Sequence, residues 1–201
     1  MPTPHLARRE NSVCGGRVEA LIRSVEVGEA EAEAIAGIYA RHVIGGTASY
    51  DVEPPSLEDT LGKIRRVTMA GWPFLVAEVD GRLAGYAYAT QFRDRAAYRF
   101  TCEDSIYVHP DMMGRGLGRA LLEVLIERSE AFGFGTMVAV IGGAEPASIS
   151  LHSKCGFTEV GRLKAVGFKF GRWLDSVYMQ RGLRAADAPN CGTSVGSLTL
   201  G

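Results

Sequence analysis

A glycine-rich segment between a predicted strand and a predicted helix constrains this chain more than any other feature of its sequence. Residues 102–108 are rich in strand-forming side chains, and residues 117–132 repeat apolar side chains at helical spacing. Gly114, Gly116 and Gly118 occupy the connection between them. The chain therefore runs from strand through glycine loop to helix, which places the loop at the amino end of the helix.

The first turn of that helix is suited to binding an anion. Its backbone N–H groups lack partners within the helix, and the helix dipole adds partial positive charge at the same point. Glycines let the backbone approach a phosphate closely, while Arg115 and Arg119 supply further positive charge. The spacing fits neither the nucleoside triphosphate P-loop nor the GxGxxG motif of dinucleotide folds. A glycine turn that only caps a buried helix is the alternative interpretation.

The remaining segments predict an α/β fold around one mixed sheet. Asp80-Gly81 favours a tight hairpin between two β-rich segments, and Ser56 with Asp59 forms a capping box before a helix that ends ahead of Gly71. Further helices are predicted at residues 29–43, 117–132 and 148–155. Strands are predicted at residues 20–24, 74–79, 82–91, 102–108, 136–141, 158–166 and 172–181.

Composition limits the classes of protein to consider. The chain has 201 residues, 46% of them hydrophobic, so we expect a single domain over residues 17–183 between loose tails at 1–16 and 184–201. Lys and Arg number 22 against 23 Asp and Glu, and this net charge of −1 provides no overall field for nucleic acid or an anionic membrane. We therefore expect neither as a partner.

The cysteine and apolar patterns point to a cytoplasmic protein. The four cysteines are far apart, and the histidines lack metal-ligand spacing, so no metal site is predicted. No apolar run approaches the roughly 18 to 20 residues that span a bilayer, and residues 1–16 lack the apolar stretch of a secretion signal.

Two segments carry a specific resemblance to a known family. The loop at residues 113–118, with Val108 before it, and the later segment at 148–157 resemble the coenzyme A motifs of the GNAT acetyltransferase superfamily, in the same order. Within that superfamily the chain resembles the phosphinothricin (glufosinate) acetyltransferase branch, from about residue 22 to residue 180. The matching residues are Thr47, Ala48, Ser49, Tyr50, Glu53, Pro54, Arg95, Ala97, Tyr98, Thr101, Cys102, Glu103, Tyr107 and Val108, with the segments 138–142 and 167–169.

The resemblance implies a fold and a cosubstrate. The fold is the GNAT acyl-CoA N-acyltransferase fold, a central mixed, mostly antiparallel sheet flanked by helices, and the cosubstrate is acetyl-CoA. The implied contacts are Ile106, Tyr107 and Val108 for the acetyl-pantetheine arm, Gly114, Arg115, Gly116, Leu117, Gly118 and Arg119 for the pyrophosphate, and Ser148 near the pantetheine. Met113 and Glu145 depart from the family pattern, and Glu145 puts a side-chain bond from its position in doubt.

Acetyl transfer to an amine needs a base, a polarised thioester and protonation of the departing thiolate. Glu103 matches the family's general base, although an isolated Glu beside Asp104 is ordinarily a solvated surface residue. His152 matches a histidine of the branch and is suited to relay protons or to orient substrate; a structural histidine is the alternative. A backbone N–H near Val108 is expected to stabilise the developing oxyanion.

The acceptor pocket is expected to include Arg95 and Tyr98, a cation and a phenol suited to a carboxylate, phosphinate or sulfone. Thr47, Ser49 and Tyr50 are expected to close over the pocket, while Trp173 is interpreted as a packing residue. A solvated basic loop is the alternative interpretation of the arginines.

The predicted function is acetyl-CoA-dependent N-acetylation of a small amino-acid-like amine of the phosphinothricin, methionine sulfone or methionine sulfoximine type. Acetylation of a protein N-terminus, a lysine or a polyamine is the alternative, followed by a coenzyme A-binding regulatory module without turnover. The resemblance also implies a homodimer.

Overall fold

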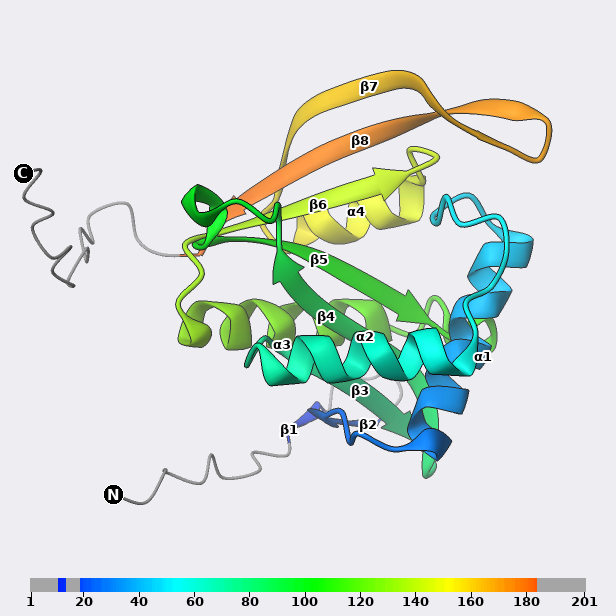
Figure 1. The fold of residues 1–201 in the computed structure, drawn as a ribbon, viewed down its shortest axis with the longest axis vertical. Helices are drawn as coiled ribbons and strands as arrows, with labels where there is room; N and C mark the ends of the chain where they lie inside the picture. Colours follow the sequence, from blue (N-terminus) through cyan, green and yellow to red (C-terminus); the bar gives the residue numbers. More distant parts are fainter. Residues whose placement is uncertain (1–10, 14–18, 184–201) are drawn as a thin grey trace, which may run out of the picture.

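The computed structural model describes residues 11–13 and 19–183, which form an eight-stranded sheet with helices on both faces (Figure 1). The strand order is β1-β2-β3-β4-β5-β6-β8-β7, and every neighbouring pair is antiparallel except β5 and β6. The elements are β1 (Asn11–Val13), β2 (Ala20–Ser24), α1 (Glu29–Gly45), α2 (Leu57–Met69), β3 (Phe74–Val79), β4 (Arg82–Gln91), η1 (Ala96–Tyr98), β5 (Thr101–Val108), η2 (Pro110–Met112), α3 (Leu117–Phe132), β6 (Thr136–Gly142), α4 (Pro146–Lys154), β7 (Thr158–Lys169) and β8 (Arg172–Gly182). The predicted mixed, mostly antiparallel sheet is confirmed.

Helices α1 and α2 cover one face of the sheet. The predicted capping box starts α2: the Ser56 hydroxyl accepts from the backbone of Asp59, whose carboxylate accepts from the backbone of Ser56. Apolar side chains at helical spacing then point inward and pack against β3 and β4. This core layer contains Ile35, Ile38, Val43, Leu61, Ile64, Val67, Phe74, Val76, Tyr86 and Tyr88.

Helices α3 and α4 lie on the opposite face. The predicted apolar stripe of α3 is buried there, and Gly133 ends the helix in the left-handed conformation. Successive side chains of a strand point to opposite faces, so Cys102 of β5 packs beneath α3 whereas Tyr107 packs beneath α1. The two faces of β5 therefore enter two separate cores.

Strands β5 and β6 pair over a short length and then diverge. Thr101, Cys102 and Glu103 each face a residue of β6, and the register stops at Glu103. Figure 1 shows the two strands separating beyond this point. We call the divergence the fork: it leaves the rest of β5 without a neighbour on that side.

Several bounds differ by one or two residues from the sequence-based predictions, and two segments differ more. Asn11–Val13 lies inside the predicted amino-terminal tail, yet it forms β1 and pairs with β2. Strand β7 extends to Lys169, past the predicted end at residue 166, because a bulge between Leu163 and Gly167 lets the pairing with β8 resume. The other residues of both predicted tails lie outside the described ranges.

Candidate active site

The unpaired edge of β5 presents backbone groups inside the fork. The His109 N–H donates to the Ala84 carbonyl on β4, at 2.8 Å. Backbone groups alternate in direction along a strand, so those of Ile106 and Val108 point away from β4, toward the side that β6 has left. In agreement, the Val108 carbonyl accepts from Nε2 of His42 at 2.8 Å, and not from β4. The backbone groups of Ile106 and the N–H of Val108 thus have no partner strand and are available to an extended ligand.

The glycine loop lies directly after this edge. Gly114 and Gly116 have φ values of 75° and 87°, in the left-handed region that glycine adopts without strain. Gly116 is the N-cap of α3 and makes no side-chain cap, so the first N–H groups of α3 have no side-chain acceptor at the N-cap. A Cβ on Gly118 would lie 3.6 Å from Val108, which shows how closely α3 approaches the end of β5. This arrangement suits an anion such as a pyrophosphate.

Three side chains of the loop have different environments. Leu117 is buried in the α3 core, so only its backbone is available to a ligand. Arg115 is exposed. Arg119 is engaged with Glu123, one turn further along α3, at 2.7 Å between Nε and Oε1. The hydrogen bond and charge of Glu123 raise the pKa of Arg119.

Glu103 stands at the point where the fork opens. Its neighbour Asp104 faces α4, so Glu103 points to the α1 and α2 face, and its side chain remains 32% exposed. Burial raises the pKa of the Glu103 carboxyl, the charge of Arg93 lowers it in part, and Asp104 raises it further. The Arg93 guanidinium lies 3.7 Å from this carboxylate and stacks over the Phe92 ring.

His152 lies on the other face of the sheet from Glu103. Its Nε2 is 3.0 Å from Oδ2 of Asp104, and its Nδ1 is 2.7 Å from the Ser148 carbonyl and 3.4 Å from the Ser148 hydroxyl. The imidazole also packs edge-on against Phe157. The structure therefore brings His152 and Ser148 together and separates both from Glu103.

Residues 46–51, which we call the α1–α2 loop, are fixed by internal hydrogen bonds. The Tyr50 hydroxyl donates to the Asp175 carbonyl and accepts from the Gly143 N–H and the Ser176 hydroxyl. The Ser49 hydroxyl contacts the Tyr39 hydroxyl at 2.7 Å. Two of the predicted acceptor-binding hydroxyls, those of Ser49 and Tyr50, thus have partners within the protein.

Close packing holds the same loop against the end of the sheet. A Cβ on Gly143 would lie 2.4 Å from the Thr47 hydroxyl oxygen, and one on Gly167 would lie 2.7 Å from the Tyr50 ring. The buried Lys169 ammonium donates to the carbonyls of Gly46 and Ser49, at 3.0 and 2.8 Å. Thr47 and Tyr50 therefore lie beside β6, across the fork from β5.

Arg95 and Tyr98 occupy the connection between β4 and β5, at the end of the sheet where Glu103 lies. The Gln91 side chain donates to the backbone carbonyls of Arg93 and Arg95 and so fixes the start of this connection. Arg95 is exposed, and Tyr98 is 39% exposed with its ring edge-on to Phe92. Both side chains face solvent in this structure.

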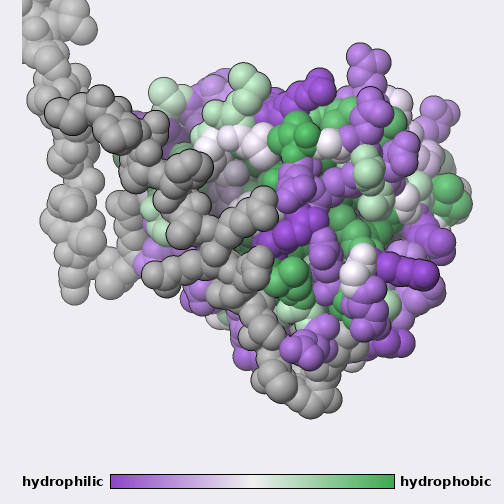
Figure 2. Space-filling model, turned by 90° about the horizontal axis from the view of Figure 1, so that it is seen from below, coloured by the Kyte–Doolittle hydropathy of each residue, from purple (hydrophilic) through white to green (hydrophobic). Residues whose placement is uncertain are grey.

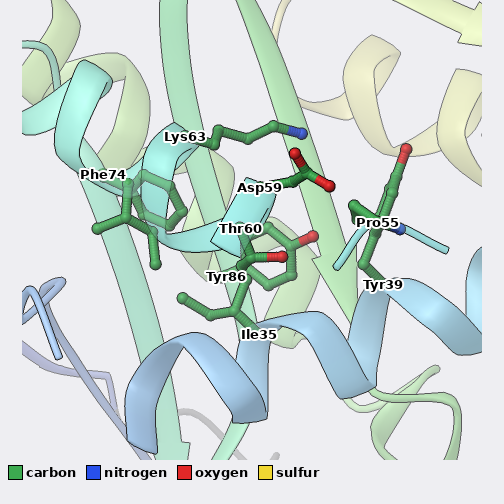
Figure 3. Close-up of a pocket in the computed structure, with 9 residues that line it drawn as sticks. Ile35, Tyr39, Pro55, Asp59, Thr60, Lys63, Phe74 and Tyr86 are labelled. Carbon is green, nitrogen blue, oxygen red and sulfur yellow. The ribbon is translucent and has the colours of Figure 1, made fainter. Parts of the chain in front are cut away.

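A small pocket opens between α1 and α2 on the Glu103 face (Figure 3). Tyr86 and Phe74 form its floor, Tyr39 a wall, and Lys63 and Asp59 lie at its rim. Its volume of about 40 Å³ is enough for little more than a water molecule. Lys63 lies over the rings of Tyr39 and Tyr88, which makes it a second cation on this face beside Arg93.

Sequence reasoning missed four residues that this geometry singles out. Asp104, Lys63 and His42 carry no motif, since their partners come from other elements. Lys169 was noted only as part of the matching segment 167–169. The one available signal was the acidic pair at Glu103 and Asp104, because alternation along a strand sends two neighbouring carboxylates to opposite faces.

The described ranges contain no group of three or more His, Cys, Asp or Glu side chains placed to hold a metal ion. Within the same residues no helix has the length and apolar character needed to cross a membrane.

Comparison with known proteins assigns the family. The model of the acetyltransferase (GNAT) family matches residues 46–157. The phosphinothricin N-acetyltransferase of Alcaligenes faecalis is 52% identical over 155 residues, which cover 77% of this chain and 79% of that protein. The L-methionine sulfoximine/L-methionine sulfone acetyltransferase of Salmonella typhimurium is 38% identical, with 81% and 95% covered.

Comparison with solved structures gives the same family. The crystal structure of a GNAT superfamily phosphinothricin acetyltransferase from Sinorhizobium meliloti, in complex with acetyl-CoA, superposes with a TM-score of 0.81 at 45% identity and covers 86% of this chain and 94% of that one. The chain belongs to the GNAT family of acetyltransferases.

Proposed function

We propose that this protein transfers the acetyl group of acetyl-CoA to the amine of a small amino-acid-like acceptor of the phosphinothricin, methionine sulfone or methionine sulfoximine type. One observation carries the proposal: Glu103 stands where the fork opens, between the unpaired edge of β5 and the arginine-bearing connection before it. Relatives named for these acceptors support the substrate class.

The residues of the fork fit acetyl-CoA. When bound, acetyl-CoA supplies the acetyl group as a thioester. The backbone groups of Ile106 and Val108 would hold its extended arm as a neighbouring strand would, and the Val108 N–H points to the side where the thioester carbonyl would lie. The N–H groups from Gly114 to Arg119 would hold the pyrophosphate. Because these contacts come from the backbone, the departures at Met113 and Glu145 leave them intact.

Glu103 would act as the general base. An amine attacks a thioester only as the neutral species, so the proton of the acceptor ammonium must first leave. The Glu103 carboxylate faces the α1 and α2 side, has solvent access and has a pKa above its ordinary value, all of which favour proton removal directly or through water. Holding amine and thioester together supplies much of the remaining rate enhancement.

The acceptor would be held by the connection between β4 and β5. Arg95 makes no ion pair with any described residue, so its guanidinium is available to an acceptor carboxylate or phosphinate. Tyr98 would add a hydroxyl from the same connection. We assign Ser49 and Tyr50 a supporting role, because their internal bonds fix the loop on which Thr47 lies.

The test is coenzyme A release from acetyl-CoA across amino-acid analogues, polyamines and lysine peptides, with wild type and Glu103→Gln in parallel. Turnover confined to sulfone, sulfoximine or phosphinate amino acids, and lowered about 100-fold in the variant, would support the proposal. Turnover only with peptides or polyamines would show that the acceptor belongs to one of those classes and not to the amino-acid analogues. No turnover together with tight acetyl-CoA binding would indicate a regulatory module.

We also propose a homodimer that uses the β7–β8 arm. This edge of the sheet exposes Val160, Phe168 and Trp173, the last at 65%, so the predicted packing role of Trp173 is wrong within one chain. Figure 2 shows the opposite end of the molecule, where hydrophilic side chains surround separate hydrophobic groups. Light scattering should give twice the 21.6 kDa chain mass. A monomeric wild type would refute the dimer. A dimeric wild type with a monomeric Trp173→Ser variant would place the dimer interface on the β7–β8 arm.

We also propose a cytoplasmic location, from the state of two cysteines. Cys102 and Cys155 are buried free thiols, as expected in a reducing compartment, and burial raises the pKa of Cys102 to about 12. Fractionation of cells that express the full chain would test this location.

A further inference from the structure

His152 and Asp104 form a buried contact between α4 and β5. Their side chains are 5% and 2% exposed, and Nε2 of His152 lies 3.0 Å from Oδ2 of Asp104. The other carboxylate oxygen, Oδ1, is buried and has no hydrogen-bond partner among the described residues. The contact with His152 is therefore the one hydrogen bond that this part of the chain offers to the Asp104 carboxylate.

The partners of His152 determine its protonation. Nδ1 lies 2.7 Å from the Ser148 carbonyl, much closer than to the Ser148 hydroxyl at 3.4 Å, so the carbonyl is its main partner. This carbonyl and the Asp104 carboxylate at Nε2 can only accept hydrogen bonds. Both contacts become hydrogen bonds only if both ring nitrogens carry a proton, which makes the ring an imidazolium. Burial alone lowers the pKa of His152, but the hydrogen bond and charge of Asp104 and the Ser148 carbonyl raise it above its ordinary value overall.

Charged and titratable groups around the pair come from four elements. Cys102 lies beside Asp104 on β5, and Cys155 follows His152 at the end of α4. Arg181 of β8 donates to the Cys155 carbonyl, and the charges of Arg119 and Glu123 of α3 act on the Cys155 thiol. The direct charge partner of the ring is Asp104.

We propose that Asp104 is a positioning residue: it holds His152 as a doubly protonated cation, and this pair fixes α4 against β5 beside the fork instead of moving protons for the acceptor. Ser148 lies one turn before His152, and its carbonyl is the second partner of the ring, so the pair sets the position of Ser148 relative to the unpaired edge of β5. The proposal rests on the function proposed above, because that function places pantetheine in the fork.

The protonation state can be measured directly. In wild-type protein with ¹⁵N-labelled histidine, both ring nitrogens of His152 should show a bonded proton at pH 7, with signals assigned by their loss in His152→Gln. Asp104→Asn should leave one ring nitrogen without a proton at the same pH. A wild-type ring with only one protonated nitrogen would overturn the proposal. If His152→Gln unfolds, sequential backbone assignment of the wild-type protein identifies the His152 ring instead.

Kinetics test whether Asp104 acts through His152. Asp104→Asn should raise the KM for acetyl-CoA about 10-fold with a smaller change in kcat, because a charge-assisted hydrogen bond is lost. The same substitution in a His152→Gln background should add nothing further. An equal rise in the acetyl-CoA KM in both backgrounds would show that Asp104 acts independently of His152. A large fall in kcat with unchanged acetyl-CoA KM in His152→Gln would show that His152 transfers protons.

Stability provides a third readout. Because the pKa of His152 is raised in the folded protein, protonation of its ring stabilises the fold. This stabilisation is fully present at pH values below the ordinary histidine pKa of about 6.5, and it is lost as pH rises through the folded pKa. The Tm gap between wild type and Asp104→Asn should therefore narrow with rising pH, whereas Asp80→Asn, in the exposed β3–β4 turn, should show no such trend. A Tm difference that does not change with pH would contradict the proposal that His152 is a cation in the folded protein. Neither the melting nor the NMR measurement needs an acceptor substrate. Failure of the proposed acceptor class can therefore be distinguished from failure of the proposal about Asp104 and His152.

Discussion

Two adjacent carboxylates on β5 have opposite environments. Glu103 points toward α1 and α2, keeps solvent access and has the half-exposed Arg93 as its nearest cation. Asp104 points toward α3 and α4, is buried, and contacts an imidazole at 3.0 Å. One residue of chain separates a group suited to exchange protons from a group held in a fixed contact. The pleat of the strand alone produces this difference, at the place where the fork opens.

Substituting each carboxylate by its amide should separate the two roles most strongly. Glu103→Gln should lower kcat about 100-fold and leave Tm and acetyl-CoA affinity near wild type, since it removes a base from a solvated site. Asp104→Asn should instead lower Tm and acetyl-CoA affinity. Coenzyme A release, calorimetry and thermal melts measure all three quantities. If both variants lost kcat and Tm in parallel, the two faces would not be functionally distinct.

A smaller effect should follow from loosening the acceptor face alone. Lys169→Met removes the donor to the carbonyls of Gly46 and Ser49, at a cost of about 1 to 3 kcal/mol in the free energy of unfolding. The KM for the acceptor should rise while acetyl-CoA affinity stays constant. Lys164→Met, on the exposed part of β7, is the matched control. An equal loss of stability in Lys169→Met and Lys164→Met would show that the hydrogen bonds of Lys169 do not hold the α1–α2 loop.

The cofactor face offers a matched pair of glycines. Gly116→Ala forces a side chain into a φ of 87° and should destabilise the protein by about 1 kcal/mol. Gly118→Ala places a Cβ at ordinary contact distance inside a helix, so its folding free energy should stay the same or improve slightly. Urea unfolding distinguishes the two; equal destabilisation would mean that the loop conformation is not set by Gly116.

The smallest effect should come from Arg93→Gln. The charge of Arg93 lowers the Glu103 pKa, so its removal should raise that pKa and move the acidic limb of the kcat/KM profile to higher pH. The displacement should be small and decrease with added salt, because Arg93 is 51% exposed. A displacement to lower pH would exclude Glu103 as the group that titrates.

Local signals predicted most of the fold. Strands β3 and β4 and helix α3 have the predicted bounds because a tight turn and a left-handed glycine mark their ends within the sequence. Strand β1 was missed because three residues carry too little pattern, and its existence depends on pairing with β2. The full length of β7 was missed because a bulge interrupts its alternation.

The candidate site was predicted only in part, for a related reason. The glycine loop and Glu103 are marked by neighbouring residues, and the family resemblance identified both. The Asp104–His152 contact joins residues 48 positions apart, and the Tyr50 hydroxyl meets residues 93 to 126 positions away. Such pairings depend on the tertiary arrangement, so no local pattern indicates them. The same separation explains why the sequence did not indicate that Tyr50 anchors its loop.

The three paired residues at the base of the fork also affect how the molecule should fluctuate. Strands β1–β5 and β6–β8 form two hydrogen-bonded halves whose backbone pairing is limited to this short junction, although side chains of both halves pack in one core. The backbone beyond the junction therefore lacks the pairing that would slow its hydrogen exchange. A ligand strand lying along Ile106 and Val108 would complete the backbone pairing across the gap. Amide hydrogen exchange at these two positions should therefore be fast in the free protein and slow in the complex, and the acetyl donor would complete the sheet while it is bound.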